Sequence, residues 1–394
     1  MRAYFDHNAT TPLDPEAAEV MVRVLREQFG NASSVHRFGQ EAKTVLDEAR
    51  TSIARLIGAE PSELVFTSGG TEADNLALRG VAEALEAAGR RHLIASAIEH
   101  EAVLVTLKAL ARRGWRTTLL PVGATGIVRP DSLEAALTDD TAIVSVMHAN
   151  NEIGTIQPVA ELAKLARARG ALFHTDAVQS VGKVAVDARA LGVDLLALSA
   201  HKFNGPKGAG ALWIRRGVRI APILTGGKHE RVRRAGTENV AAIAGFGAVA
   251  STAPAKMAAT MPRVAAMRDR LEAEILARVP GTAVNGEREP RVPGCTETGS
   301  RERKVAGICH LCFEDVDAES LLMLLDQAGL CASAGSSCSS GAMEPSHVLV
   351  AMGVPKELAG GSVRLSLGWS STDTDVDAAL ELIPPAVEQL RRPR

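Results

Sequence analysis

Short apolar runs alternate with amphipathic stretches along the first half of the chain. Each run has the length of a buried strand, and the runs lie at 63–67, 92–97, 142–147, 171–175, 194–199 and 210–215. Between the runs, apolar residues recur at every third or fourth position, which is typical of helices. Strands and helices that alternate in this way predict βαβ units and a mainly parallel sheet. We therefore predict an α/β fold.

Helix signals continue to the end of the chain. Asp14 as an N-cap, followed by Pro15, marks the start of the first helix, which we expect to stop at Gly30. Further helices are predicted at 40–57, 73–88, 158–169, 261–278, 317–328 and 373–390, and further strands at 305–313 and 362–367.

The helix at 261–278 is expected to link two domains. A chain of 394 residues is long enough for two or more of them. We expect a large domain at 15–258 and a smaller one made of 1–14 plus 259–394.

Charge and hydropathy give no sign of nucleic acid or membrane as a partner. Charged residues make up 23% of the chain and the formal net charge is −2. The first residues lack the apolar stretch of a signal peptide, and no apolar run approaches the length of a membrane span. We expect a cytoplasmic protein.

The cysteines suggest a working thiol rather than a disulfide framework, since their number is odd and no signal peptide is apparent. All five lie in the last hundred residues: Cys295, Cys309, Cys312, Cys331 and Cys338. Cys309 and Cys312 form a CxxC pair, which in other contexts binds zinc or carries redox chemistry. Residues three apart on a strand point to opposite faces, and no second cysteine pair completes four ligands, so we expect no metal.

Cys338 lies in the middle of a stretch rich in glycine and serine, 335–347. That stretch has no apolar face to pack into a core, so it predicts a loop that carries an exposed thiol. A free cysteine is otherwise among the most buried residue types, which makes this position informative.

Polar side chains follow two of the predicted strands. His174, Thr175 and Asp176 end the run at 171–175, and Ser199, His201 and Lys202 end the run at 194–199. Open α/β sheets bind their ligands at such strand ends. An aspartate and a lysine in this place can form a plain ion pair, but the set also suits pyridoxal phosphate.

Pyridoxal phosphate requires a lysine amine for a Schiff base and an acid that keeps its ring nitrogen protonated. Lys202 and Asp176 suit these two roles. Gln179 suits a hydrogen bond to the ring hydroxyl, and Ser199 and His201 suit the phosphate.

A second anion-binding signal precedes the helix at 73–88. Gly70 and Thr71 lie between a strand and that helix, where glycines expose the first amide groups. Helices also begin this way for purely structural reasons. Together with Ser199 and His201, the motif leads us to expect that Gly70 and Thr71 bind the cofactor phosphate.

The motifs HTDAVQ and SAHKFNGPKG resemble the cofactor cradle of the class V aminotransferase family. Within that family the chain is most similar to cysteine desulfurases of the NifS/IscS type, from YFDHNATTPLD at Tyr4 to the last helix. The resemblance implies the three-layer fold of pyridoxal-phosphate transferases, with a smaller α+β domain that carries the catalytic cysteine loop.

The resemblance also implies roles for single residues. His100 would stack on the cofactor ring and handle substrate protons, and Asn151 would contact the cofactor and the substrate carboxylate. Thr237 would reach the phosphate of the neighbouring subunit, so that each site needs a homodimer. Arg364, the single charge of its predicted strand, suits a bidentate grip on the α-carboxylate of the substrate.

The activity implied is conversion of L-cysteine to L-alanine, with Lys202 handling the α-proton and Cys338 taking the sulfur as a persulfide. The loop sequence resembles that of desulfurases which feed iron–sulfur scaffolds, so a protein sulfur acceptor is expected. Selenocysteine lyase, another class V aminotransferase-type enzyme and sulfur supply for tRNA thiolation remain as alternatives. Aminotransfer needs no loop cysteine, and a silent partner protein would not need both Lys202 and Cys338.

Some features receive no assignment. The basic run within 226–240 suits an anion or RNA patch, although a solvated loop is the commoner explanation. The polar segment 293–307 has no functional interpretation, and the sequence does not identify the sulfur acceptor.

Overall fold

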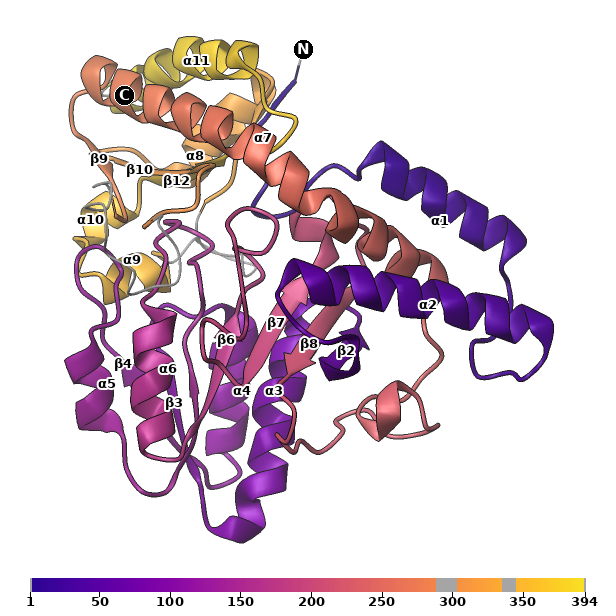
Figure 1. The fold of residues 1–394 in the computed structure, drawn as a ribbon. Helices are drawn as coiled ribbons and strands as arrows, with labels where there is room; N and C mark the ends of the chain where they lie inside the picture. The colour runs from indigo at the N-terminus through magenta and orange to yellow at the C-terminus, as the bar shows by residue number, and fades with distance from the viewer. Residues whose placement is uncertain (1, 288–302, 335–344, 393–394) are drawn as a thin grey trace.

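A large sheet with its helices and a smaller α+β body make up the chain. The computed structural model describes residues 2–287, 303–334 and 345–392. In Figure 1 the smaller body lies above the large sheet, and the long helix α7 (Val240–Arg278) runs from one to the other.

The large sheet is parallel except for one strand, which confirms the predicted α/β class. Its order is β2 (Leu64–Thr67), β8 (Gly210–Ile214), β7 (Leu195–Ser199), β6 (Leu172–Asp176), β5 (Thr141–Ser145), β3 (His92–Ser96) and β4 (Arg116–Leu120). Only β8 runs antiparallel to its neighbours β2 and β7. Because β2 and β7 flank β8, both point the same way and their carboxyl ends meet at one edge.

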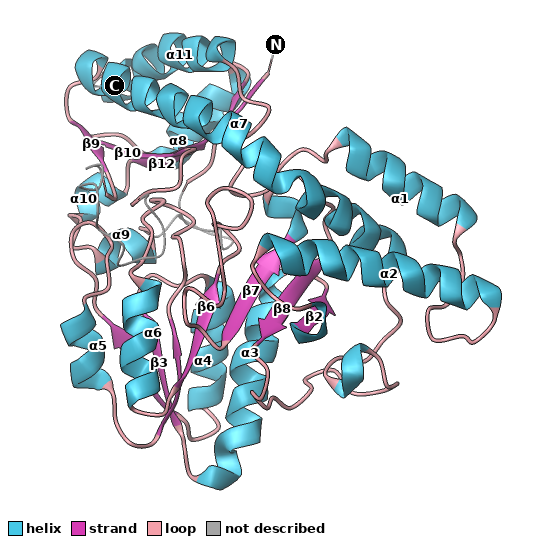
Figure 2. Cartoon of the chain, in the orientation of Figure 1, coloured by secondary structure: helices cyan, strands magenta, loops and turns pink. Residues whose placement is uncertain are grey.

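Helices cover both faces of this sheet, which gives three layers (Figure 2). They are α2 (Arg37–Leu56), α3 (Gly70–Leu85), α4 (Glu101–Ala111), α5 (Pro130–Ala136) and α6 (Val159–Ala168), while α1 (Pro15–Glu27) packs against α7. The connections include the 3-10 turns η1 (Pro61–Glu63), η2 (Glu86–Ala88), η3 (Ala200–Lys202) and η4 (Glu230–Val232).

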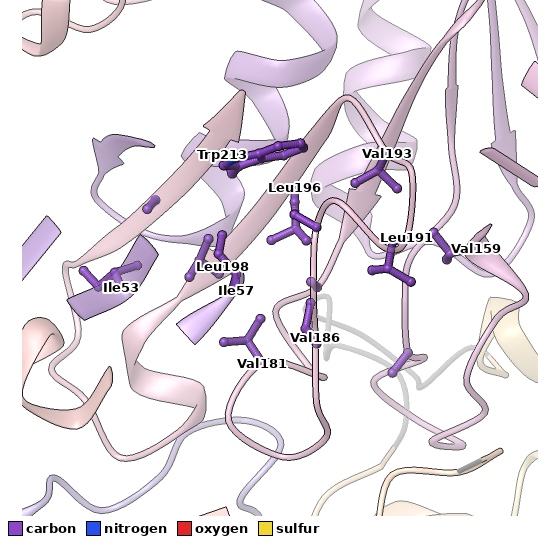
Figure 3. Close-up of a cluster of buried hydrophobic side chains, with 14 of the residues drawn as sticks. Ile53, Ile57, Val159, Val181, Val186, Leu191, Val193, Leu196, Leu198 and Trp213 are labelled. Carbon is purple, nitrogen blue, oxygen red and sulfur yellow. The ribbon is translucent and has the colours of Figure 1, made fainter. Parts of the chain in front are cut away.

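Alternate residues of the central strands enter different cores, as the pleat of a strand requires. Leu196 and Leu198 of β7 pack with α2, and Figure 3 shows them near Ile53 and Ile57. Leu195 and Ala197 of the same strand face the core made by α3 and α4 instead. Each such buried side chain contributes about 1.5–3 kcal/mol. A strand apolar on both faces therefore sits in the middle layer.

The linking helix is much longer than predicted. We expected it at 261–278, whereas α7 begins at Val240 and includes Pro254 and Pro262. A proline inside a helix removes one backbone hydrogen bond and so disfavours a continuous helix. Burial overrides that preference, because Phe246 packs into the large-sheet core and Leu271 into the core of the smaller body.

By length and composition α7 is also apolar enough to cross a membrane. No apolar run of that length was expected from the sequence. The mean hydropathy of α7 is 1.2 over an 18-residue window, and 56% of that window is buried. This is the burial of a helix in a protein core.

The smaller body contains two small sheets and the remaining helices. Antiparallel strands occur in the order β12 (Ser362–Ser366), β10 (Ile308–Phe313), β9 (Thr282–Val284), and β1 (Ala3–Tyr4) pairs in parallel with β11 (Leu330–Cys331). The helices are α8 (Ala318–Gln327), α9 (His347–Ala351), α10 (Lys356–Ala359) and α11 (Asp373–Arg391). Phe5 of the N-terminal segment is buried in this body, beside residues of α7 and α11.

Three elements begin three residues away from their predicted starts. α2 begins at Arg37 rather than residue 40, because His36 caps it by accepting from the Gly39 N–H through Nδ1 at 3.3 Å. α3 begins at Gly70 rather than 73. β10 begins at Ile308 rather than 305, after Gly307 passes so close to Leu367 that an added Cβ would lie 2.2 Å from its carbonyl oxygen.

Candidate active site

Most of the predicted site residues line one cavity at the carboxyl ends of the central strands. Loops after β2, β3, β5, β6 and β7 supply its walls, since these strands all end at the same edge. The lining residues are Gly70, Thr71, Asp74, His100, Met147, Asn151, Asp176, Val178, Gln179, Ser199, His201 and Lys202. Tertiary structure thus brings together nine residues that the sequence had singled out separately.

Lys202 ends the 3-10 turn η3 directly after β7. Its Nζ donates hydrogen bonds to the backbone oxygens of Asn8 at 2.7 Å and Ala9 at 2.8 Å. Burial and, to a smaller extent, the nearby Arg364 lower the pKa of Lys202 to about 8, although Asp176 acts in the opposite direction. A sizeable share of the amine is therefore neutral near physiological pH, as a nucleophile or proton acceptor requires.

Asp176 is the last residue of β6 and is 5% exposed. Its Oδ1 accepts a hydrogen bond from the Val178 N–H at 2.8 Å. Burial raises the pKa of Asp176, while His100 and Lys202 lower it. A buried carboxyl with so few donors gains most from a cationic partner, such as a protonated ring nitrogen.

The opposite end of the cavity suits an anion. Gly70 and Thr71 open the 16-residue helix α3, whose first amide groups face outward from its N-terminus. Ser199 is 2% exposed, and its hydroxyl has no hydrogen-bond partner within the described residues. That hydroxyl lies 3.9 Å from where a Cβ on Gly69 would stand. An orphaned buried donor beside a helix N-terminus fits a phosphate group.

His201 adds a neutral ring to this anion end. Burial lowers its pKa to about 4, with a further contribution from Lys202. Its Nδ1 lies 3.1 Å from the Thr10 hydroxyl, which leaves Nε2 for a ligand. The residues present therefore fit pyridoxal phosphate at both ends of the cavity.

His100 and Asn151 are held from outside the cavity. His100 caps α4 by accepting from the Ala102 N–H through Nδ1 at 3.1 Å, which fixes its ring. The Asn151 backbone oxygen accepts from Asn8 Nδ2 at 2.9 Å and from Arg364 Nη1 at 3.1 Å. The His100 ring and the backbone of Asn151 are thus both held by neighbouring residues.

Arg364 and Thr237 do not line this cavity. Arg364, on β12, pairs with Asp6 at 3.0 Å and donates to the Ser333 hydroxyl at 2.7 Å, so it approaches the cavity only through Asn151. Thr237 lies exposed in the loop after η4. Cys338 and Cys295 lie outside the described residues.

The CxxC pair is split between two cores, as its strand positions predicted. Cys309 is buried in the core of the smaller body, whereas Cys312 belongs to a cluster with Ile98 and Met147. Asn285 donates to Cys312 Sγ at 3.0 Å. Burial raises the pKa of Cys312 to about 11 and raises that of Cys309 as well, so both stay protonated at neutral pH.

Several residues near the cavity were not predicted from the sequence. Asp74 and Glu99 are fully buried carboxyls near Asp176; burial raises the pKa of Glu99 to about 8 and that of Asp74 well above its usual value. Asn8 contacts Lys202, and Lys183 contacts Asn8 and Gln179. The available signals were weak: Asp74 follows Gly70 by one helical turn, and Lys183 follows Gln179 by four residues.

The chain is similar to known proteins over nearly its whole length. The family model "Aminotransferase class-V" matches residues 3–379. The chain is 47% identical over 388 residues to "Cysteine desulfurase IscS" of Methanosarcina thermophila, covering 98% of this chain and 92% of that protein. It is also 47% identical to "Cysteine desulfurase IscS" of Dictyoglomus turgidum, with 98% and 95% covered.

Solved structures are similar over almost the whole chain. A "NIFS-LIKE PROTEIN" superposes with a TM-score of 0.89 at 35% identity and covers 99% of this chain and 100% of its own. A structure described as "SspA in complex with cysteine" has a TM-score of 0.79 at 30% identity and covers 94% and 100%.

Proposed function

The chain belongs to the class V aminotransferase family and, within it, to the cysteine desulfurases of the NifS/IscS type; from this premise we propose how its residues divide the reaction. It binds pyridoxal phosphate, converts L-cysteine to L-alanine and transfers the sulfur to Cys338 as a persulfide. The observation that supports this most is the meeting of the Lys202 amine, the buried Asp176 carboxyl and the orphaned Ser199 hydroxyl in one cavity.

Pyridoxal phosphate, when bound, supplies an electron-withdrawing ring that makes the α-proton of an amino acid acidic. Asp176 would hold the ring nitrogen, and Gly70, Thr71, Ser199 and His201 would hold the phosphate. These contacts set the position of the ring between the strand ends.

The chain's own groups then move protons and hold the substrate. Lys202 accepts and returns the α-proton at Nζ, for which a pKa near neutrality is the favourable value. Asn151 and Arg364 orient the substrate carboxylate, because the guanidinium matches a carboxylate in two hydrogen bonds. His100 transfers the proton on the side of the substrate from which the sulfur leaves.

Cys338 takes the sulfur. Its thiolate attacks the substrate sulfur, a sulfur–sulfur bond forms, and the carbon–sulfur bond breaks with its electron pair left on carbon. Protonation of that carbon completes L-alanine, so one thiol and one cysteine become one persulfide and one alanine. We further propose a protein acceptor for this sulfur, an iron–sulfur scaffold, on the resemblance of the loop sequence; sulfur supply for tRNA thiolation is the alternative.

Purified protein loaded with pyridoxal phosphate is expected to release alanine from L-cysteine and, with a thiol reductant, sulfide in equal amount. The matched control is L-serine, which offers oxygen in place of the sulfur that Cys338 would attack. Amino-acid analysis and sulfide detection measure the two products. Formation of a keto acid without sulfide would show an aminotransferase instead.

The proposed homodimer is supported by exposed apolar surface as well as by Thr237. Phe29, Val35 and Phe38 are 74%, 93% and 49% exposed, and the two phenylalanine rings lie 5.0 Å apart. Apolar side chains gathered at one place on a surface are typical of protein interfaces. If Thr237 contributes to the site of the neighbouring subunit, two subunits with different defects should regain activity when they form a mixed dimer.

Mixing the Lys202→Ala and Thr237→Ala proteins under subunit exchange is expected to restore activity that neither has alone. Half of the dimers are then mixed and each holds one intact site, so roughly a quarter of wild-type activity should appear. Each variant mixed with itself is the control. No recovery, or a monomer that keeps full activity at high dilution, would contradict the shared site.

A further inference from the structure

Lys183 lies in a tight turn that is pinned against the segment carrying Lys202. The backbone N–H groups of Lys183 and Val184 both bond to the Ser180 oxygen at 2.9 Å. Gly182 has φ +78°, and a Cβ there would lie 2.6 Å from the Cβ of Phe203. Only glycine permits this approach, and it brings the Lys183 side chain beside Lys202.

No carboxylate forms an ion pair with Lys183 within the described part of the chain. Its Nζ donates to Gln179 Oε1 at 2.7 Å and to Asn8 Oδ1 at 3.1 Å. Burial lowers the pKa of Lys183, and the positive charges of Lys202 and Arg364 lower it further. A partly buried amine without an anion costs stability, and here its hydrogens are satisfied by two side-chain amides beside the cavity.

The two hydrogen bonds fix the direction of two side-chain amides. A lysine amine has hydrogens for both oxygens whether it is charged or neutral, so Gln179 Oε1 and Asn8 Oδ1 both face it. The nitrogen of each amide must then face the other way. Gln179 Nε2 donates one hydrogen to the Asn8 backbone oxygen at 3.0 Å and keeps the second free, and Gln179 lines the cavity.

The same network includes Lys202. The Asn8 backbone oxygen accepts from Gln179 Nε2 and also from Lys202 Nζ. Asn8 in turn is held by its N–H on the Ser366 hydroxyl at 3.0 Å and by Nδ2 on the Asn151 oxygen. Lys183 therefore stabilises the one arrangement in which the Gln179 donor and the Lys202 amine share an acceptor.

We propose that Lys183 is a positioning residue that holds the Gln179 amide with its NH₂ toward the ring hydroxyl of bound pyridoxal phosphate. This inference rests on the proposed function, because it assigns Gln179 to that hydroxyl. Without Lys183 only the hydrogen bond from Gln179 Nε2 to the Asn8 backbone oxygen favours this direction, so the reversed amide becomes more populated. Its oxygen would then face the ring oxygen, and an attractive contact would become a repulsive one.

The test compares two ligands on the apo-protein: pyridoxal phosphate and its 3-deoxy analogue, which lacks the ring hydroxyl. Lys183→Met keeps the chain length and removes the donors, whereas Lys183→Arg keeps donors. Loss of a hydrogen bond to a charged oxygen is worth about tenfold or more in affinity. We expect Lys183→Met to lose that factor for pyridoxal phosphate, to bind the analogue as the wild type does, and Lys183→Arg to lose less.

A double-mutant cycle tests whether the effect passes through Gln179. Lys183→Met should weaken binding of pyridoxal phosphate little further once Gln179→Ala is in place. Gln179→Glu gives an independent check should Lys183→Met fail to fold, because it keeps an oxygen for Lys183 and removes the NH₂. It should weaken the natural ligand and spare the analogue.

The outcomes separate this inference from the function on which it rests. Equal weakening of both ligands, or additive losses in the cycle, would reduce Lys183 to a structural role and overturn the proposal. A wild-type protein that binds no pyridoxal phosphate would instead overturn the proposed function. Thermal unfolding of each apo-variant shows whether a loss of affinity reflects a loss of folding.

Discussion

Replacing Lys202 by alanine is expected to abolish almost all alanine release, together with the visible absorbance of the protein loaded with pyridoxal phosphate. In the proposed mechanism Lys202 both anchors the cofactor and moves the α-proton, and the proton transfer alone is worth about 10²–10⁴-fold in rate. Lys207→Ala, an exposed lysine of the same segment, is the matched control and should keep both absorbance and turnover. A Lys202→Ala protein with wild-type turnover would refute the assignment.

The lowered pKa of Lys202 supplies a second measurement on the same residue. An amine reacts with an acylating reagent only when neutral, so labelling of Lys202 in the apo-protein should rise with pH through about 8. Arg364 lowers this pKa, because a neighbouring positive charge disfavours the ammonium form. Arg364→Gln should therefore move the labelling midpoint to higher pH.

Replacing Cys338 by alanine is expected to stop sulfur transfer while leaving cysteine binding intact. Mixing the variant with cysteine should still change its visible spectrum, yet almost no alanine should appear, because no thiolate is present to accept the sulfur. In the wild type, mass spectrometry should find an extra sulfur on the peptide that holds Cys338. With selenocysteine as the substrate, the Cys338→Ala protein should lose less activity, since selenium leaves more readily than sulfur.

Cys331→Ala is the matched control for this experiment, because Cys331 is partly exposed and lies away from the cavity, with Asp326 3.7 Å from its Sγ. Cys309 and Cys312 are buried and have raised pKa values, so neither supplies a thiolate readily. An extra sulfur found on either of them, with Cys338→Ala fully active, would contradict the mechanism.

The N-terminal segment contacts both the large-sheet side of the site and the smaller body. Asn8 and Ala9 offer backbone oxygens to Lys202 from across the molecule, while Asp6 holds Arg364 of the smaller body. A movement of the smaller body relative to the large sheet would therefore act on Lys202 and on Arg364 together.

The sequence by itself determined the class of fold and most of the cavity wall. Buried strands appear as short apolar runs, and parallel strands end at one edge, so residues such as Asp176, Ser199 and Lys202 had to meet there. Local pattern was sufficient because each residue follows its own strand directly. The boundaries of α2, α3 and β10 were less accurate, since capping and close backbone approach depend on particular contacts.

Only the tertiary structure decided what surrounds those residues. The sequence predicted a helix only at 261–278, whereas packing against two cores extends α7 back to Val240, through Pro254. The carbonyl groups of Asn8 and Ala9 have no signature in sequence, because every residue carries one, and they reach Lys202 only when the chain closes on itself. Likewise, the pKa of Lys202 is lowered by burial, which depends on long-range packing rather than on local residue order. Long-range packing also decides that no carboxylate of the described chain pairs with Lys183.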